Sequence, residues 1–154
     1  MQQMLNKAIV LAATHHDGQF DKSGLPYILH VMKVMHYLKS NDEELNCIAV
    51  LHDIIEDTSC TFQDLIDAGM SERVECGVRL LTKQRGQRYM EEYLDGIASN
   101  PDAIRVKMAD LRHNMDVRRL KGVTDKDMQR IAKYSRAYNF LDGALAAHRL
   151  TGVV

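Results

Sequence analysis

The chain has 154 residues, the size of one domain, and its 20 basic and 21 acidic side chains give a net charge of −1. So balanced a charge supports neither nucleic acid nor an acidic membrane surface as a partner, and no apolar stretch reaches the ~18 residues of a membrane span. Three cysteines without CxxC spacing exclude a disulfide framework and a zinc knuckle, and they favour a reducing cytoplasm.

Proline placement and apolar spacing predict an all-α fold, because the chain has only two prolines and strand-like alternation is scarce. The segment 18–25 is polar and contains glycine, so we expect a functional loop there. Pro26 suits the first turn of a helix over 27–40. Asp42 can cap a second helix, over 43–55.

Further capping signals mark the middle of the chain. Thr61 followed by Asp64 predicts a capping box for a short helix that ends at Gly69. Ser71 can cap the next helix, which runs through Leu81. These signals predict two helices separated by a turn.

The last third of the chain contains the longest predicted helices. After a polar segment over 83–88, which we expect to be a second functional loop, Pro101 opens a helix that reaches about Arg119. Thr124 begins a final amphipathic helix that ends near Gly152. Because the apolar stripe of this helix suits either a core or a dimer surface, homo-oligomerisation stays open.

Four ionisable side chains are concentrated in the segment AVLHDIIEDT. His52 and Asp53 are adjacent in an apolar run, and Glu56 and Asp57 follow one helical turn later. Three carboxylates this close repel one another unless a cation or a proton intervenes, and a divalent cation would satisfy them. The simpler alternative is a solvated acidic helix end capped by Thr58.

Two further residues can complete such a metal site. His30 lies among apolar residues, where a histidine is more often a core side chain than a ligand, and Asp110 lies in mid-helix, where a buried carboxylate needs a partner. Together with His52 and Asp53 they supply two imidazoles and two carboxylates from three helices. This set suits Mn²⁺, Fe²⁺, Zn²⁺ or Mg²⁺ with positions left open for water and substrate.

The order of these motifs resembles a known family. HDGQ at 16–19, GLPYILH at 24–30, LHDIIEDT at 51–58, LTK at 81–83 and KMADLRHNM at 107–115 resemble the hydrolase domain of RelA/SpoT-type enzymes, within the HD-domain phosphohydrolases. The resemblance covers roughly residues 4–120. It implies a single all-helical HD-type domain, taken here as residues 1–154, with Mn²⁺ held by the four residues above. It also implies hydrolysis of the 3′-diphosphate of guanosine tetra- or pentaphosphate, with release of pyrophosphate.

The resemblance also implies roles for other side chains. Glu56 and Asp57 match residues that activate or orient the attacking water, and Asn114 matches a residue that helps bind the nucleotide sugar. Tyr27 is a candidate for stacking or for donation to phosphate. A diphosphate leaving group needs positive charge beyond that of the metal, and the candidate phosphate partners are Lys22, Lys83, Lys107 and Arg112.

Two departures from the family pattern concern substrate recognition. The family usually has a basic residue where this chain has Asp21, and Arg-Thr often follows the HNM triplet where this chain has Asp116 and Val117. These differences keep open an HD phosphohydrolase that acts on another nucleotide or phosphorylated metabolite. A non-catalytic nucleotide sensor is the third hypothesis, and the complete set of metal-ligand and water-activating residues argues against it.

Overall fold

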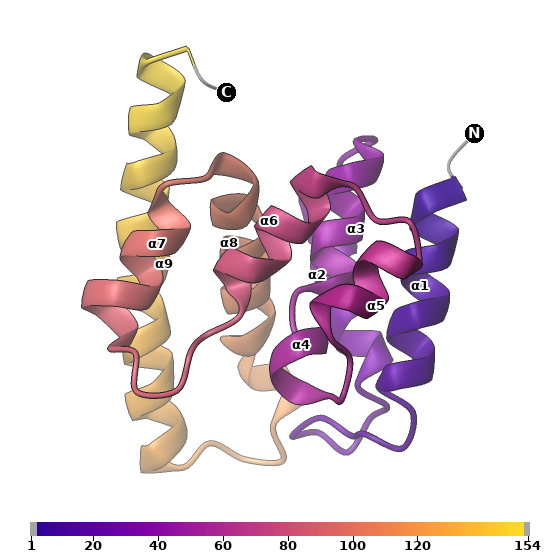
Figure 1. Ribbon diagram of the computed structural model, residues 1–154. Coiled ribbons are helices and arrows are strands. Elements are labelled where there is room, and N and C mark those ends of the chain that lie inside the picture. The colour runs from indigo at the N-terminus through magenta and orange to yellow at the C-terminus, as the bar shows by residue number, and fades with distance from the viewer. Residues whose placement is uncertain (1–2, 153–154) are drawn as a thin grey trace.

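A computed structural model describes residues 3–152, and within them the chain is a bundle of helices (Figure 1). The α-helices are α1 (Gln3–His15), α2 (Ile28–Leu38), α3 (Glu43–Leu51), α4 (Ile54–Asp57), α5 (Phe62–Asp67), α6 (Glu72–Leu81), α7 (Leu94–Ala98), α8 (Pro101–Asn114) and α9 (Asp125–Leu150). The described residues contain no β-strand; one isolated bridge joins Phe20 to Pro26. The all-α prediction is therefore confirmed, while the predicted domain ends, 1–2 and 153–154, lie outside the described residues.

The predicted helix starts are confirmed by side-chain caps. The Asp42 carboxylate accepts a hydrogen bond from a backbone amide in the first turn of α3, and the Ser71 hydroxyl does the same for α6. Thr61 and Thr124 each form a full capping box, at the starts of α5 and α9. These contacts satisfy amide groups that helix geometry leaves without partners, and for this reason the signals can be recognised in sequence.

The prediction of one continuous helix over 43–55 is wrong. The α3 helix ends at Leu51 and α4 begins at Ile54, and between them Asp53 has φ −104° and ψ −3°, which is the bridge region. This turn redirects the chain at the histidine–aspartate pair. As a consequence the pair lies between two helices and not on the side of one.

The predicted helix from Pro101 to about Arg119 is also shorter than expected. It ends at Asn114, because Asp116 has extended backbone (φ −73°, ψ 97°) and its carboxylate accepts a hydrogen bond from the amide of Arg118. A separate 3₁₀ turn, Val117–Arg119, follows. Three elements were not predicted, because no start signal marks them in the sequence: α1, the π-helix Tyr89–Tyr93 and α7.

The core is centred on α3, in which every residue from Leu45 to Leu51 is buried. The α3 helix packs against α1, α2, α6 and α8, while α8 also contacts α2, α7 and α9. In Figure 1, α1 and α9 lie at opposite sides of the bundle, with α2, α3, α6 and α8 between them. This packing brings the N-terminal end of α2, the α3–α4 turn and α8 together. None of the helices in the described residues is long and apolar enough to cross a membrane.

Candidate metal centre

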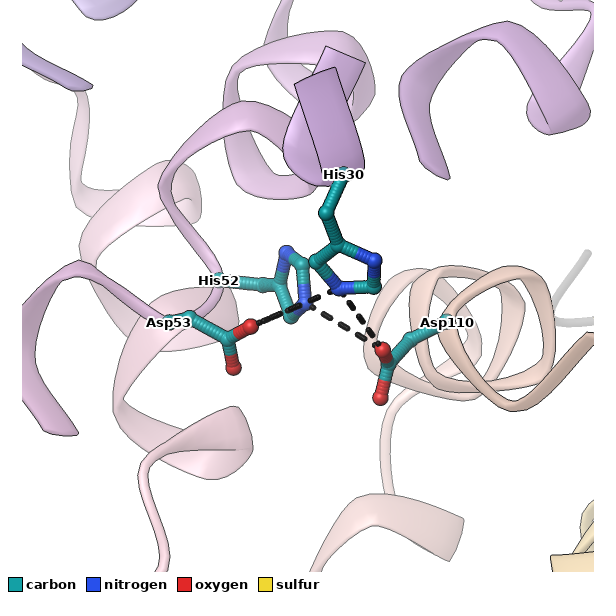
Figure 2. Close-up of side chains that lie close together, drawn as sticks. All are labelled: His30, His52, Asp53 and Asp110. Atoms are coloured by element: carbon teal, nitrogen blue, oxygen red, sulfur yellow. Dashed lines mark ion pairs between the residues drawn. The ribbon is translucent and has the colours of Figure 1, made fainter. Parts of the chain in front are cut away.

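Four side chains from three parts of the fold converge on one point (Figure 2). His30 comes from α2, His52 and Asp53 from the α3–α4 turn, and Asp110 from α8. One nitrogen or oxygen atom of each lies within 4.8 Å of the others. The His52 Nε2 atom is 2.9 Å from Asp53 Oδ2, and His30 Nε2 is 3.1 Å from Asp110 Oδ1. The structure thus brings together the four predicted ligands.

The orientation of His52 shows that this cluster fits a cation. Its Nδ1 atom lies 2.7 Å from the carbonyl oxygen of Ala49, and because a carbonyl only accepts, Nδ1 carries the hydrogen. In the neutral imidazole, Nε2 therefore has a lone pair, and this buried atom faces the Asp53 carboxylate at 2.9 Å. Lone pairs facing carboxylates require a metal ion or a proton between them. Burial lowers the pKa of His52, yet Asp53 and Asp110 outweigh it and raise the pKa to about 10, so a proton can take the place of the cation.

Asp110 is held from both sides along α8. Lys107 Nζ donates to Oδ2 at 2.8 Å, and Asn114 Nδ2 donates to Oδ1 at 2.6 Å. Burial alone would raise the pKa of this carboxyl, but Lys107 and the two imidazoles keep the pKa well below its usual range. Asp110 is thus an ionised ligand candidate with a fixed orientation. Two of the six residues predicted to bind substrate, Lys107 and Asn114, are thus hydrogen-bonded to Asp110 in this structure.

The remaining carboxylates lie at the rim of the cluster. Tyr27 Oη donates to Asp53 Oδ2 at 2.6 Å and to Asp57 Oδ2 at 3.4 Å. Glu56 Oε1 accepts a hydrogen bond from the Lys83 amide at 2.9 Å, which ties it to the predicted loop 83–88. Burial and the neighbouring Asp53 charge raise the pKa values of both Glu56 and Asp57. A raised pKa makes a carboxylate a better proton acceptor near neutral pH.

A cavity of about 430 Å³ opens above the cluster and is lined by most of the predicted substrate-binding residues. Lys22, Tyr27, Lys83, Lys107 and Asn114 all border it. Several lining residues were not predicted, namely Phe20, Tyr89, Tyr93, Arg119, Arg130 and Tyr134. Arg130 and Tyr134 are four residues apart on one face of α9, a signal that the sequence contained but that has meaning only once α9 is placed beside the cavity.

Arg112 and Asp21 occupy positions that the sequence did not indicate. Arg112 is not among the described residues that line the cavity; its guanidinium stacks on the ring of Tyr37, 4.1 Å from the centroid, beside a separate groove. The predicted contact of Arg112 with substrate phosphate therefore has no support from the geometry. Asp21 Oδ2 accepts from Arg119 Nη2 at 2.7 Å, and its Oδ1 accepts from Ser23 and from a loop amide. These bonds lower the pKa of Asp21, although burial opposes them.

No family model matches the chain. It is 35% identical over 95% of its length to the bifunctional (p)ppGpp synthase/hydrolase SpoT of Escherichia coli strain K12, covering 22% of that protein. It is 36% identical over 80% of its length to a guanosine-3′,5′-bis(diphosphate) 3′-pyrophosphohydrolase of Haemophilus influenzae, covering 20% of it. The chain thus spans about a fifth of these relatives.

The fold also matches a solved structure over almost its whole length. That structure is described as a metazoan ortholog of SpoT that hydrolyses ppGpp and plays a role in starvation responses. The match covers 99% of this chain and 97% of the other, with a TM-score of 0.76 and 22% sequence identity. The chain is therefore related in sequence to the SpoT-type proteins and has the helical fold of one of them, which confirms the resemblance carried by the motifs.

Proposed function

We propose that this relative of the SpoT-type proteins is a metal-dependent (p)ppGpp 3′-pyrophosphohydrolase, acting as one HD-type domain over residues 1–154. The observation that carries the proposal is the His₂Asp₂ cluster, of which His30, Asp53 and Asp110 line a cavity together with the carboxylates of Glu56 and Asp57. The names of the relatives support a (p)ppGpp-type substrate, and the cavity combines the carboxylates and cationic side chains that a metal-assisted phosphoryl reaction needs.

His30, His52, Asp53 and Asp110 would hold the metal, for which Mn²⁺ is our first choice and Fe²⁺, Zn²⁺ or Mg²⁺ the alternatives. A divalent cation held there would lower the pKa of a water and polarise a phosphoryl oxygen. The low pKa of Asp110 keeps this ligand ionised across the physiological pH range. The Nδ1–H bond of His52 to Ala49 keeps its Nε2 atom free for the metal.

Glu56 and Asp57 would orient the attacking water and accept its proton. Both side chains are at the rim of the cluster, and burial together with Asp53 raises their pKa values toward the range in which a carboxylate acts as a general base. The Lys83 amide fixes Glu56, and the Tyr27 hydroxyl contacts Asp57. Two carboxylates held at fixed positions can thus deprotonate a water without large rearrangement.

The cavity walls would bind the phosphate groups of the substrate. Positive charge on the cavity wall comes from four side chains, those of Lys22, Lys83, Arg119 and Arg130. Lys107 is bound to Asp110, so its charge acts at the base of the cavity and offsets the carboxylates there. Asn114 would contact the nucleotide sugar after releasing part of its bond to Asp110.

The proposed activity is tested with purified protein, Mn²⁺ and ppGpp, by separating GDP and pyrophosphate from substrate by anion-exchange chromatography. We expect turnover by the wild type, loss of turnover in Asp53→Ala, and unchanged turnover in Asp142→Ala, which alters an exposed carboxylate on α9. A panel of other nucleotides tests the alternative substrate: cleavage of one of them in place of ppGpp contradicts the proposal. Binding of ppGpp and Mn²⁺ without turnover would favour the sensor hypothesis instead.

We further infer a cytoplasmic protein whose partner is a phosphorylated nucleotide, with no role for nucleic acid or membrane. The three free cysteines, of which Cys47 and Cys60 are buried and Cys76 is exposed, suit a reducing compartment. The net charge of −1 offers no general attraction to nucleic acid. Self-association is the remaining partner hypothesis, and analytical ultracentrifugation measures it directly.

A further inference from the structure

One imidazole behind the metal cluster has no role in the mechanism described above. His113, on α8, packs against the back of His30, with ring centroids 4.9 Å apart and planes inclined by 23°. The two Nδ1 atoms are 2.7 Å apart, which is hydrogen-bond distance. His113 therefore touches a candidate metal ligand on the side away from the metal.

The short distance between these nitrogens constrains where the hydrogen lies. Two N–H groups facing each other at this distance would repel, and two bare nitrogens would gain no bond, so one Nδ1 donates and the other accepts. His30 presents Nε2 to the cluster, 3.1 Å from Asp110 Oδ1, and a metal ligand must offer a lone pair there. The hydrogen of a metal-bound His30 is consequently on Nδ1, and the Nδ1 atom of His113 accepts it.

The two candidate histidine ligands are thus oriented by different groups. His52 donates to a backbone carbonyl, which no side-chain substitution removes. His30 donates to the side chain of His113. The backbone of His113 is held by Arg119, whose Nη1 atom donates to the His113 carbonyl oxygen at 3.0 Å and whose Nη2 atom is paired with Asp21. The ring of Tyr37 meets His113 edge-on from the other side, with centroids 6.1 Å apart.

We propose that His113 is a positioning residue that fixes the tautomer and ring orientation of His30 so that Nε2 points at the metal. The inference rests on the proposed metal centre but not on the identity of the substrate. Hydrogen-bond acceptors of this kind typically contribute 10- to 100-fold to metal affinity, because without them the ligand ring samples other tautomers and rotations. The acceptor here is an imidazole nitrogen, so the substitution of one side chain isolates its effect.

The test is the affinity of the folded protein for Mn²⁺, measured by isothermal titration calorimetry. His113→Phe keeps a stacked ring but removes the acceptor, and we expect its Mn²⁺ affinity to fall by about 10- to 100-fold. His113→Asn places an amide oxygen close to the position of the lost Nδ1, and we expect it to recover most of the affinity. His36→Phe, at an exposed position on α2, is the matched control and leaves the affinity unchanged.

Three results would overturn the inference. The first is a Mn²⁺ affinity of H113F equal to that of the wild type. The second is a loss of Mn²⁺ affinity in H113N as large as that in H113F. The third is a loss of the same size in the His36→Phe control. Circular dichroism verifies that each variant is folded, and His113→Leu replaces H113F in the comparison if the aromatic ring disrupts folding. A wild type that binds no Mn²⁺ refutes the metal centre and this inference with it. A wild type that binds Mn²⁺ but does not cleave ppGpp refutes only the proposed function, and the comparison of affinities still decides the role of His113.

Discussion

Gly77 on α6 allows that helix to approach α3, the helix that leads into the His52–Asp53 turn. A Cβ atom built at this position would lie 2.6 Å from Ile48 Cδ1, 2.9 Å from Cγ1 and 3.0 Å from Cγ2. Ile48 is fully buried, so its side chain has no free space into which it can turn. We therefore expect Gly77→Ala to destabilise the protein, although alanine favours helices.

The magnitude follows from two opposing terms. Replacing glycine by alanine within a helix gains about 1 kcal/mol from intrinsic propensity, whereas overpacking a rigid core costs about 1–3 kcal/mol. Gly143, in α9, is the matched control, because a Cβ there has no neighbour within 4 Å. Both substitutions share the propensity term, so the difference in unfolding free energy between Gly143→Ala and Gly77→Ala isolates the steric cost, about 1–3 kcal/mol.

Urea denaturation followed by circular dichroism measures these differences. We expect Gly143→Ala to be more stable than wild type and Gly77→Ala to be less stable, with a lower melting temperature by about 2–4 °C for each kcal/mol lost. Ile48→Val removes the Cδ1 atom closest to the new methyl group, so it should partly restore the stability of Gly77→Ala in a double-mutant cycle. Equal stabilities of the two alanine variants, or a cycle without coupling, would refute the steric argument.

Three other predictions concern ions and helix ends. Arg73 contacts Asp42, Glu44 and Asp102 and helps to lower the pKa values of Asp42 and Glu44. Carboxyls with lowered pKa values stabilise the fold above the unfolded pKa of about 4 and lose that contribution as the pH falls. The free energy of unfolding, measured by urea denaturation, should therefore decline less between about pH 5 and pH 2 in Arg73→Met than in the wild type. Thr124→Ala should cost about 1 kcal/mol by removing the capping box of α9, and Thr124→Ser should retain most of it in the same urea assay. Mn²⁺ at about 100 times its dissociation constant should add about 2.7 kcal/mol to the free energy of unfolding. This gain is measured as a rise in melting temperature, which EDTA should reverse and which Asp110→Ala should lack. An equal rise in Asp110→Ala would place the metal elsewhere.

Much of the fold was accessible from the sequence because helix caps are local. Thr61, Ser71 and Thr124 satisfy amides within three residues of themselves, so a short pattern is enough to identify where α5, α6 and α9 begin. Asp53 shows the limit of such patterns. Its backbone breaks a helix that apolar spacing predicts to be continuous, and its side chain contacts Tyr27 and His30, which are more than 20 residues away along the chain.

The composition of the candidate site was likewise determined by the sequence, whereas its shape depended on the tertiary structure. A histidine–aspartate pair in an apolar segment, with further carboxylates nearby, requires a cation or a proton wherever it lies, and this requirement identified the four candidate ligands. Which side chains face the cavity depends on how distant helices pack. Arg130 on α9 therefore borders the cavity, Arg112 on α8 stacks on Tyr37 outside it, and His113 meets His30 across 83 residues of chain. Separations of this length carry no periodic signal, since only packing brings such residues together.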